Sequence, residues 1–170
     1  MTHQISAIVG RQEVLAQVAR ALGVTGVVGL PQGFALFPLP ERPSHLCGQS
    51  EAGDEIVGRF RDLSEELKDK LGGLSVRGAI AYVETEYWGG DGTQGAIVWK
   101  EGVVVARHPH RNESNTSAPE SAPINRCLRA IGVIKAEKSF DEFDSIGLGA
   151  CRTNEEWAKR IGSCIEREGE

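Results

Sequence analysis

The chain has 170 residues, of which 40% are hydrophobic and 25% charged, and its formal net charge is -5. This composition is typical of a folded globular protein and argues against a disordered chain. The mild acidity argues against broad binding to nucleic acid or to an anionic membrane, because both need a basic surface. A basic protein partner stays possible. The N-terminus lacks the basic and then apolar stretch of a secretory signal, so we expect a cytoplasmic protein.

The first third of the chain predicts a strand, a helix and a hairpin. Residues 4–10 predict a short strand or a lead-in to a helix. Apolar residues recur at the helical period over 11–22 and Gly23 follows them, which predicts a helix that ends there. Residues 26–39 contain strand formers around a Pro-Gln-Gly turn and predict a tight hairpin or a broken strand. Prolines and glycines over 38–53 predict a loop.

An amphipathic helix is predicted over about 54–71. Asp54 suits its N-cap, one stripe of apolar residues follows the helical period, and Gly72 and Gly73 end it. Its other face is heavily charged, which we interpret as a solvated surface.

The clearest strand pattern lies in the middle of the chain. Three strands are predicted over 76–88, 94–100 and 103–107, with a short hairpin connection at Gly102. The first is apolar on both faces in its middle, which predicts a sheet covered on both sides. These elements predict an α+β fold, in which an antiparallel sheet centred on residues 76–107 packs against amphipathic helices.

The C-terminal third predicts a loop and then helices. Residues 107–122 have no apolar period and predict a loop. Pro123 starts a predicted helix that Gly132 ends. Two capping boxes predict the starts of two further helices: Ser139 with Glu142, and Thr153 with Glu156. We therefore expect a single domain over 1–170, with loops at about 38–53 and 107–122.

The cysteines and histidines indicate no metal site or cofactor. The four cysteines contain no CxxC pair, and we expect free thiols, with a disulfide framework or a zinc site as the alternatives: Cys47, Cys127, Cys151 and Cys164. His108 and His110 lie in the predicted loop without a carboxylate or cysteine beside them.

The glycine-rich segment 88–95 is the most distinctive stretch of the sequence. A phosphate-binding loop needs glycines between a strand and a helix N-terminus. Here a strand follows, and no Gly-Lys-Ser/Thr is present. We interpret the segment as a wide β-hairpin loop, with a partner-binding loop and a nucleotide loop as alternatives.

Glu84 and Glu86 lie two apart on a predicted strand, so both carboxylates face one side. Paired carboxylates can perform acid–base chemistry when a third group, such as Asp91, lies at a defined distance. No serine lies in a Gly-x-Ser-x-Gly motif, and no cysteine has the context of a nucleophile. We therefore expect a binding protein and no enzyme.

Several segments resemble a family of small, uncharacterised bacterial proteins. The segments are AYVETEYWGG at 81–90, QGAIVW at 94–99, PINRCLR at 123–129 and DEFDSIGLG at 141–149. In its overall type the chain resembles the immunity proteins of bacterial polymorphic-toxin systems, which are small, acidic and cytoplasmic. The resemblance implies a protein that binds and neutralises a cognate toxin domain, without direct contact to nucleic acid or membrane.

Two alternatives stay open. One is an adaptor or structural module of a bacterial assembly, and the other is a small hydrolase that uses Glu84, Glu86 and Asp91. For the immunity type, acids would complement a basic partner such as a nuclease domain, and aromatic side chains would anchor it. The predicted partner-facing residues are Glu84, Glu86, Tyr87, Trp88, Asp91 and Gln94, with the acidic turn Asp141, Glu142 and Asp144 as a second candidate.

Overall fold

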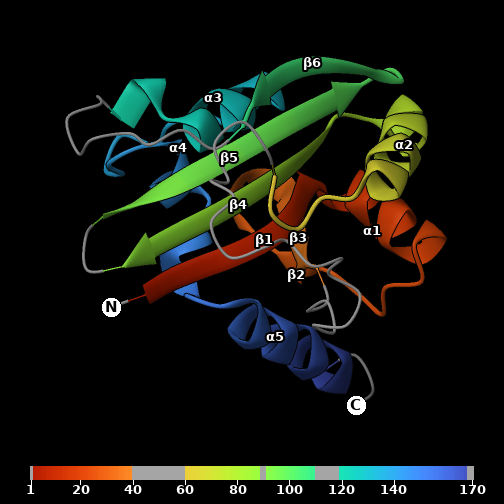
Figure 1. Cartoon of the computed structure of the whole chain (residues 1–170). Helices are drawn as coiled ribbons and strands as arrows, with labels where there is room; N and C mark the ends of the chain where they lie inside the picture. The colour runs from red at the N-terminus through yellow and green to blue at the C-terminus, as the bar shows by residue number, and fades with distance from the viewer. Residues whose placement is uncertain (1, 40–59, 89–90, 110–118, 168–170) are drawn as a thin grey trace, which may run out of the picture.

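The computed structural model describes residues 2–39, 60–88, 91–109 and 119–167 (Figure 1). Within these ranges six strands form one antiparallel sheet in the order β2-β3-β1-β4-β5-β6. The strands are β1 (Thr2–Arg11), β2 (Val28–Gly29), β3 (Phe34–Pro38), β4 (Ile80–Trp88), β5 (Asp91–Lys100) and β6 (Val103–His108). The helices are α1 (Gln12–Ala21), α2 (Glu65–Leu74), α3 (Pro123–Ala130), α4 (Glu142–Ser145) and α5 (Asn154–Arg167). The predicted α+β fold is confirmed.

β1 lies inside the sheet, between β3 and β4. Its partners are antiparallel on both sides, so that Ala7 pairs with Pro38 of β3 and with Val83 of β4. Consecutive apolar residues of β1 and of β4 are fully buried, because helices cover both faces of the sheet. For residues 4–10 the sequence predicted either a short strand or a lead-in to a helix. The structure makes it a ten-residue strand and extends the sheet well beyond the predicted centre.

Helices α2 and α3 lie on opposite faces of the sheet (Figure 1). Gly72 of α2 lies against the Trp99 indole, whereas the backbone N–H of Ile124 in α3 donates to the Gln94 side chain at 2.9 Å. Trp99 and Gln94 are separated by an odd number of positions on β5, so their side chains point to opposite faces. Helix α5 packs against β1, β2 and β3.

The predicted helix over 54–71 begins later than expected. Residues 54–59 lie outside the described residues, and 60–64 are not helical. The observed helix, α2, begins at Glu65, because the Ser64 side chain accepts a hydrogen bond from the Leu67 backbone N–H at 3.2 Å. Phe60 and Leu63 belong to the predicted apolar stripe but pack from an irregular segment. The prediction that Phe60 and Leu63 pack against the core was therefore correct, whereas the helical interpretation of 60–64 was wrong.

The hairpin between β4 and β5 is tighter than predicted. Pairing between β4 and β5 continues to Trp88 opposite Asp91, so the connection consists of 89 and 90 alone, and the predicted wide loop is wrong. At the other end, Glu101 and Gly102 form a tight turn with φ angles of +54° and +84°, as the predicted hairpin required. The predicted start of the first strand at 76 is also wrong, because 75–77 form a 3-10 turn before β4.

The C-terminal helices match the sequence in two of three starts. Helix α3 begins at Pro123, and Thr153 Oγ1 accepts from the Glu156 backbone N–H at 3.3 Å. The start at Ser139 is wrong, because Asp141 is the N-cap of α4 and accepts from the Asp144 backbone N–H at 2.8 Å. An aspartate two positions further on has the same capping chemistry as a serine.

Two of the four cysteines lie within the described side chains. Cys127 and Cys151 are free thiols and both are buried. Burial raises the pKa of the Cys127 thiol to about 12. The predictions for Cys47 and Cys164 lie outside the described side chains. Over the described ranges, no helix combines the length and the apolar character that crossing a membrane requires.

A matched pair of glycine substitutions tests the packing. A Cβ on Gly92 would overlap the carbonyl oxygen of Glu86 and lie 2.6 Å from the Cα of Tyr87. A Cβ on Gly73, inside α2, would meet nothing within 4 Å. We expect Gly92→Ala to lower the free energy of unfolding by about 1–3 kcal/mol, and Gly73→Ala to raise it by about 0.5–1 kcal/mol. Urea unfolding measures both; an unchanged stability of Gly92→Ala would contradict the register of β4 and β5.

Candidate functional site

A group of polar side chains gathers where β1, β4 and the segment before α2 meet. Alternate residues of β4 point to the face that carries α2, and Ser6 of β1 lies opposite Glu84 in the pairing register. Arg61 and Asp62 reach this group from the segment before α2. We call the group the acidic cluster, and its members are Ser6, Arg61, Asp62, Tyr82, Glu84 and Glu86.

Glu84 is the centre of the acidic cluster and is fully buried. Its carboxylate accepts hydrogen bonds from the backbone N–H groups of Arg61, at 2.8 Å, and Asp62, at 3.3 Å, and from the hydroxyl of Tyr82. A buried carboxylate is costly unless it is hydrogen-bonded. Burial and the neighbouring charge of Glu84 raise the pKa of Tyr82 well above its usual value, which keeps that hydroxyl a neutral donor. Glu84 thereby fastens the segment before α2 to the sheet.

Arg61 supplies the guanidinium of the acidic cluster. It contacts Asp62 at 3.0 Å, Glu86 at 3.1 Å and the Ser6 hydroxyl at 3.1 Å. Burial opposes its charge, but the neighbouring carboxylates, Asp62 first, outweigh burial and raise its pKa. Two carboxylates thus contact this one cation and a third, Glu84, lies near it, which leaves an excess of negative charge. Sequence reasoning missed Arg61 and Asp62 because it placed them on the solvated face of a helix.

Of the predicted partner-facing residues on β4, some side chains are buried and others are exposed. Glu84 has no exposed surface, whereas the Glu86 side chain is 29% exposed and Trp88 is 61% exposed. Glu86 and Trp88 share the face of the acidic cluster, since they are two positions apart on one strand. The structure does not describe the side chain of Asp91, so the prediction for this residue lies outside the described side chains.

Tyr87 and Gln94 lie on the opposite face and contact each other. The Gln94 amide donates to the Tyr87 hydroxyl at 2.7 Å and accepts from the Ile124 backbone N–H at 2.9 Å. Gln94 therefore satisfies a free N–H in the first turn of α3 and joins that helix to the sheet. This contact gives Gln94 a structural role independent of any partner.

The acidic turn predicted as a second candidate lies beside α3, and its acids have partners within the chain. Asp141 accepts from the Asn125 amide at 3.0 Å. Glu142 is 8% exposed and pairs with Arg129 at 2.9 Å. Asp144 accepts from the backbone N–H of Phe140 at 3.0 Å. The structure does not bring this turn together with the acidic cluster, because the two occupy opposite faces of the sheet.

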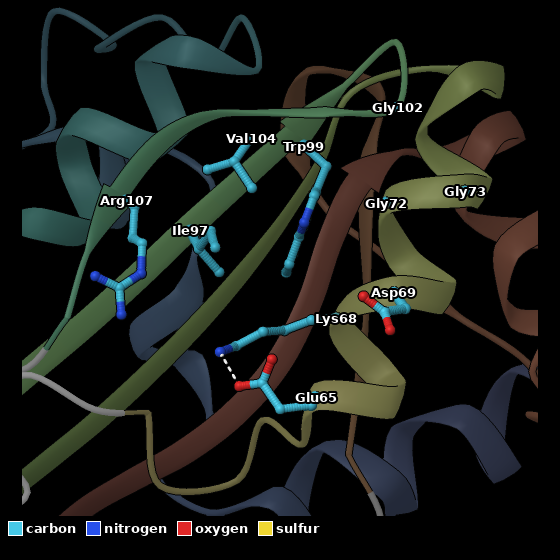
Figure 2. Close-up of a pocket in the computed structure, with 10 residues that line it drawn as sticks. All are labelled: Glu65, Lys68, Asp69, Gly72, Gly73, Ile97, Trp99, Gly102, Val104 and Arg107. Carbon is cyan, nitrogen blue, oxygen red and sulfur yellow. Dashed lines mark hydrogen bonds and ion pairs between the residues drawn. The ribbon is translucent and has the colours of Figure 1, made fainter.

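A cleft of about 360 Å³ lies between α2 and the strands β5 and β6 (Figure 2). Trp99 and Ile97 form its floor, α2 contributes the ion pair between Lys68 and Glu65 at 2.6 Å, and Arg107 lies at its far side. Glu84 and Glu86, two carboxylates of the hydrolase alternative, do not line this cleft. Over the described part of the chain, no cluster of His, Cys, Asp and Glu could hold a metal ion.

No protein-family model, curated protein or solved structure matches the chain. The resemblance to immunity proteins therefore stays a prediction from sequence.

The hydrogen bonds to Glu84 make a testable contribution to stability. We expect Glu84→Gln to lower the free energy of unfolding by about 3 kcal/mol, because the amide leaves buried donors without a charged acceptor. Tyr82→Phe removes one donor and should cost about 1–3 kcal/mol. In a double-mutant cycle followed by urea unfolding, the combined loss should be smaller than the sum of the two. Strict additivity would mean that the two side chains do not interact.

His3 is a titratable group in an apolar setting on the opposite face. Its ring packs edge to face on Phe143 with centroids 5.7 Å apart, and Nδ1 lies 2.8 Å from the Thr85 hydroxyl. Its Nε2 is buried without a hydrogen-bond partner within the described structure. Burial, together with the charge of Arg152, lowers the pKa of His3 against the opposing effects of Glu156 and nearby carbonyls.

His3 should make stability depend on pH near neutrality. A histidine whose pKa is lower in the folded state binds fewer protons there than in the unfolded chain, so acid favours unfolding. We expect the free energy of unfolding to fall as the pH decreases from about 7 to 5, through the unfolded pKa of about 6.5. His3→Gln should flatten this dependence. Equal slopes for the two proteins, from urea unfolding at several pH values, would exclude the role of His3.

Proposed function

We propose that this chain is an immunity-type protein that binds a cognate toxin domain through the exposed end of β4 and so blocks that domain. The observation that carries the proposal is the position of Trp88, which is 61% exposed at the end of a strand in the sheet. Trp88 shares its face with Glu86 and the acidic cluster. Tryptophan is enriched among the residues that dominate binding energy in interfaces.

The charge beside Trp88 supports a basic partner. The side chains of Asp62 and Glu86 are 31% and 29% exposed, so part of the excess negative charge reaches the surface. Complementary charge accelerates association and discriminates against wrong partners. A toxin domain that acts on nucleic acid must itself hold phosphates and carry a basic surface, which makes such a domain the partner that this end of the molecule fits.

The backbone supports a preorganised surface. Glu86 lies opposite Gln4 of β1 and Thr93 of β5, and Trp88 lies opposite Thr2 and Asp91. Strand pairing on both sides fixes the backbone beneath the two side chains before a partner arrives. Preorganisation lowers the entropy that binding costs.

The test is affinity for the toxin domain encoded next to this protein, measured by calorimetry at low and high salt. We expect Trp88→Ala and Glu86→Lys each to weaken binding by about tenfold or more. The wild type and Trp88→Ala should both bind more weakly at high salt, whereas Glu86→Lys should lose part of this dependence on salt. Phe140→Ala and Glu137→Lys are matched controls, since both residues are exposed and lie beyond α3 in the chain. Thermal unfolding checks that each variant is folded. Unchanged affinity of folded Trp88→Ala would overturn the proposed surface.

A further inference from the structure

Exposed apolar side chains gather at the end of the sheet remote from Trp88. Val76 is 68% exposed, and Val103, Val104 and Val105 are 59%, 49% and 50% exposed. Val76 lies next to the turn that leads into β6, and the other three are consecutive in β6. Contiguous apolar patches on a protein surface mark interaction sites. We call residues 103–105 the valine edge.

The valine edge belongs to the last strand of the sheet. β6 pairs with β5 on one side, and no strand of the described structure pairs with its other side. An edge strand presents unpaired backbone N–H and C=O groups, which natural proteins protect with proline, lysine or a bulge. A bulge is present where β6 pairs with Val98 and Trp99. Neither a proline nor a lysine interrupts residues 103–107.

The charges around the valine edge are arranged symmetrically. Glu101 precedes Val104 by three positions and Arg107 follows it by three. Both charged residues are exposed. Within the described residues neither forms an ion pair, and the Arg107 guanidinium lies 5.6 Å from the centroid of the Phe60 ring. Figure 2 places Gly102, Val104 and Arg107 in succession along this outermost strand.

We propose that the valine edge binds the same edge of a second copy of this chain, antiparallel and across a two-fold axis at Val104. This register sets Val104 against Val104 of the second copy and Val103 against Val105. Glu101, in the turn that precedes β6, then lies near Arg107 of the other copy, which gives two ion pairs per dimer. A two-fold axis also makes the two edges equivalent, so that both carry the same bend. Cross-strand valine pairs and opposite charges both favour such pairing.

The dimer leaves the proposed toxin-binding end free. β5 runs from Asp91, opposite Trp88, to Lys100, next to the turn at Glu101. Ten residues of strand span roughly 30 Å, so the two surfaces lie at opposite ends of the sheet. The inference does not depend on the proposed function, and each can fail without the other.

Charge reversal gives the sharpest test. Wild-type protein should sediment with concentration-dependent mass approaching twice the 18.3 kDa of the chain. Glu101→Lys or Arg107→Glu alone sets like charges against each other and should weaken the dimer by about tenfold or more. An equimolar mixture of the two single variants should dimerise again, because each variant then offers the charge that the other needs. Failure of the mixture to recover would overturn the register.

A second comparison covers the case in which a charge variant does not fold. Val104→Lys puts a charge on the two-fold axis and should leave the protein monomeric. Ile134→Lys is the matched control, since Ile134 is 74% exposed and lies outside β6, and it should dimerise like the wild type. A wild-type protein that stays monomeric at all concentrations, or a dimer that survives Val104→Lys, would refute the proposal.

Discussion

The burial of one carboxylate constrains much of this structure. Glu84 lies on an interior strand with no exposed surface, and an unpaired charge in that position would cost several kcal/mol. The backbone N–H groups of Arg61 and Asp62 satisfy it. These contacts require residues 60–64 to leave the helical conformation, because two successive N–H groups must turn toward the sheet. The late start of α2 follows from that requirement. So do the position of Arg61 and the excess negative charge of the acidic cluster.

Local patterns in the sequence predicted the local elements well. The helix at 11–22, the helix that starts at Pro123 and the hairpin at Gly102 each depend on residues close together in the chain, and all three are present. The position of β1 was harder, because its apolar run fits a buried strand or a helix equally, and its partners β3 and β4 are far away in the sequence. Residues of β1 are identified as a strand by their pairing with β3 and β4, which only the folded chain shows.

The candidate site divides in the same way. Alternation along β4 correctly places Glu84, Glu86 and Trp88 on one face. It gives no information on which of these side chains is covered, since the cover comes from residues 60–64, twenty or more positions before Glu84. The helical spacing of Phe60 and Leu63 drew Arg61 and Asp62 into a predicted helix. A strand pattern thus finds the face of a site, whereas the long-range contact decides that Glu84 is structural and Trp88 is exposed.

The two adjacent glycines of α2 have a dynamic consequence. Helix α2 has ten residues and ends in Gly72, Gly73 and Leu74 before the turn at Ser75, and glycine loses more backbone entropy on folding than any other residue. Since no neighbour fills the space beside Gly73, nothing compensates that loss. We therefore expect α2 to open locally before the paired strands do, and its amide hydrogens to exchange with solvent faster than those of β1. Each opening removes one wall of the cleft and briefly exposes the Trp99 indole to water.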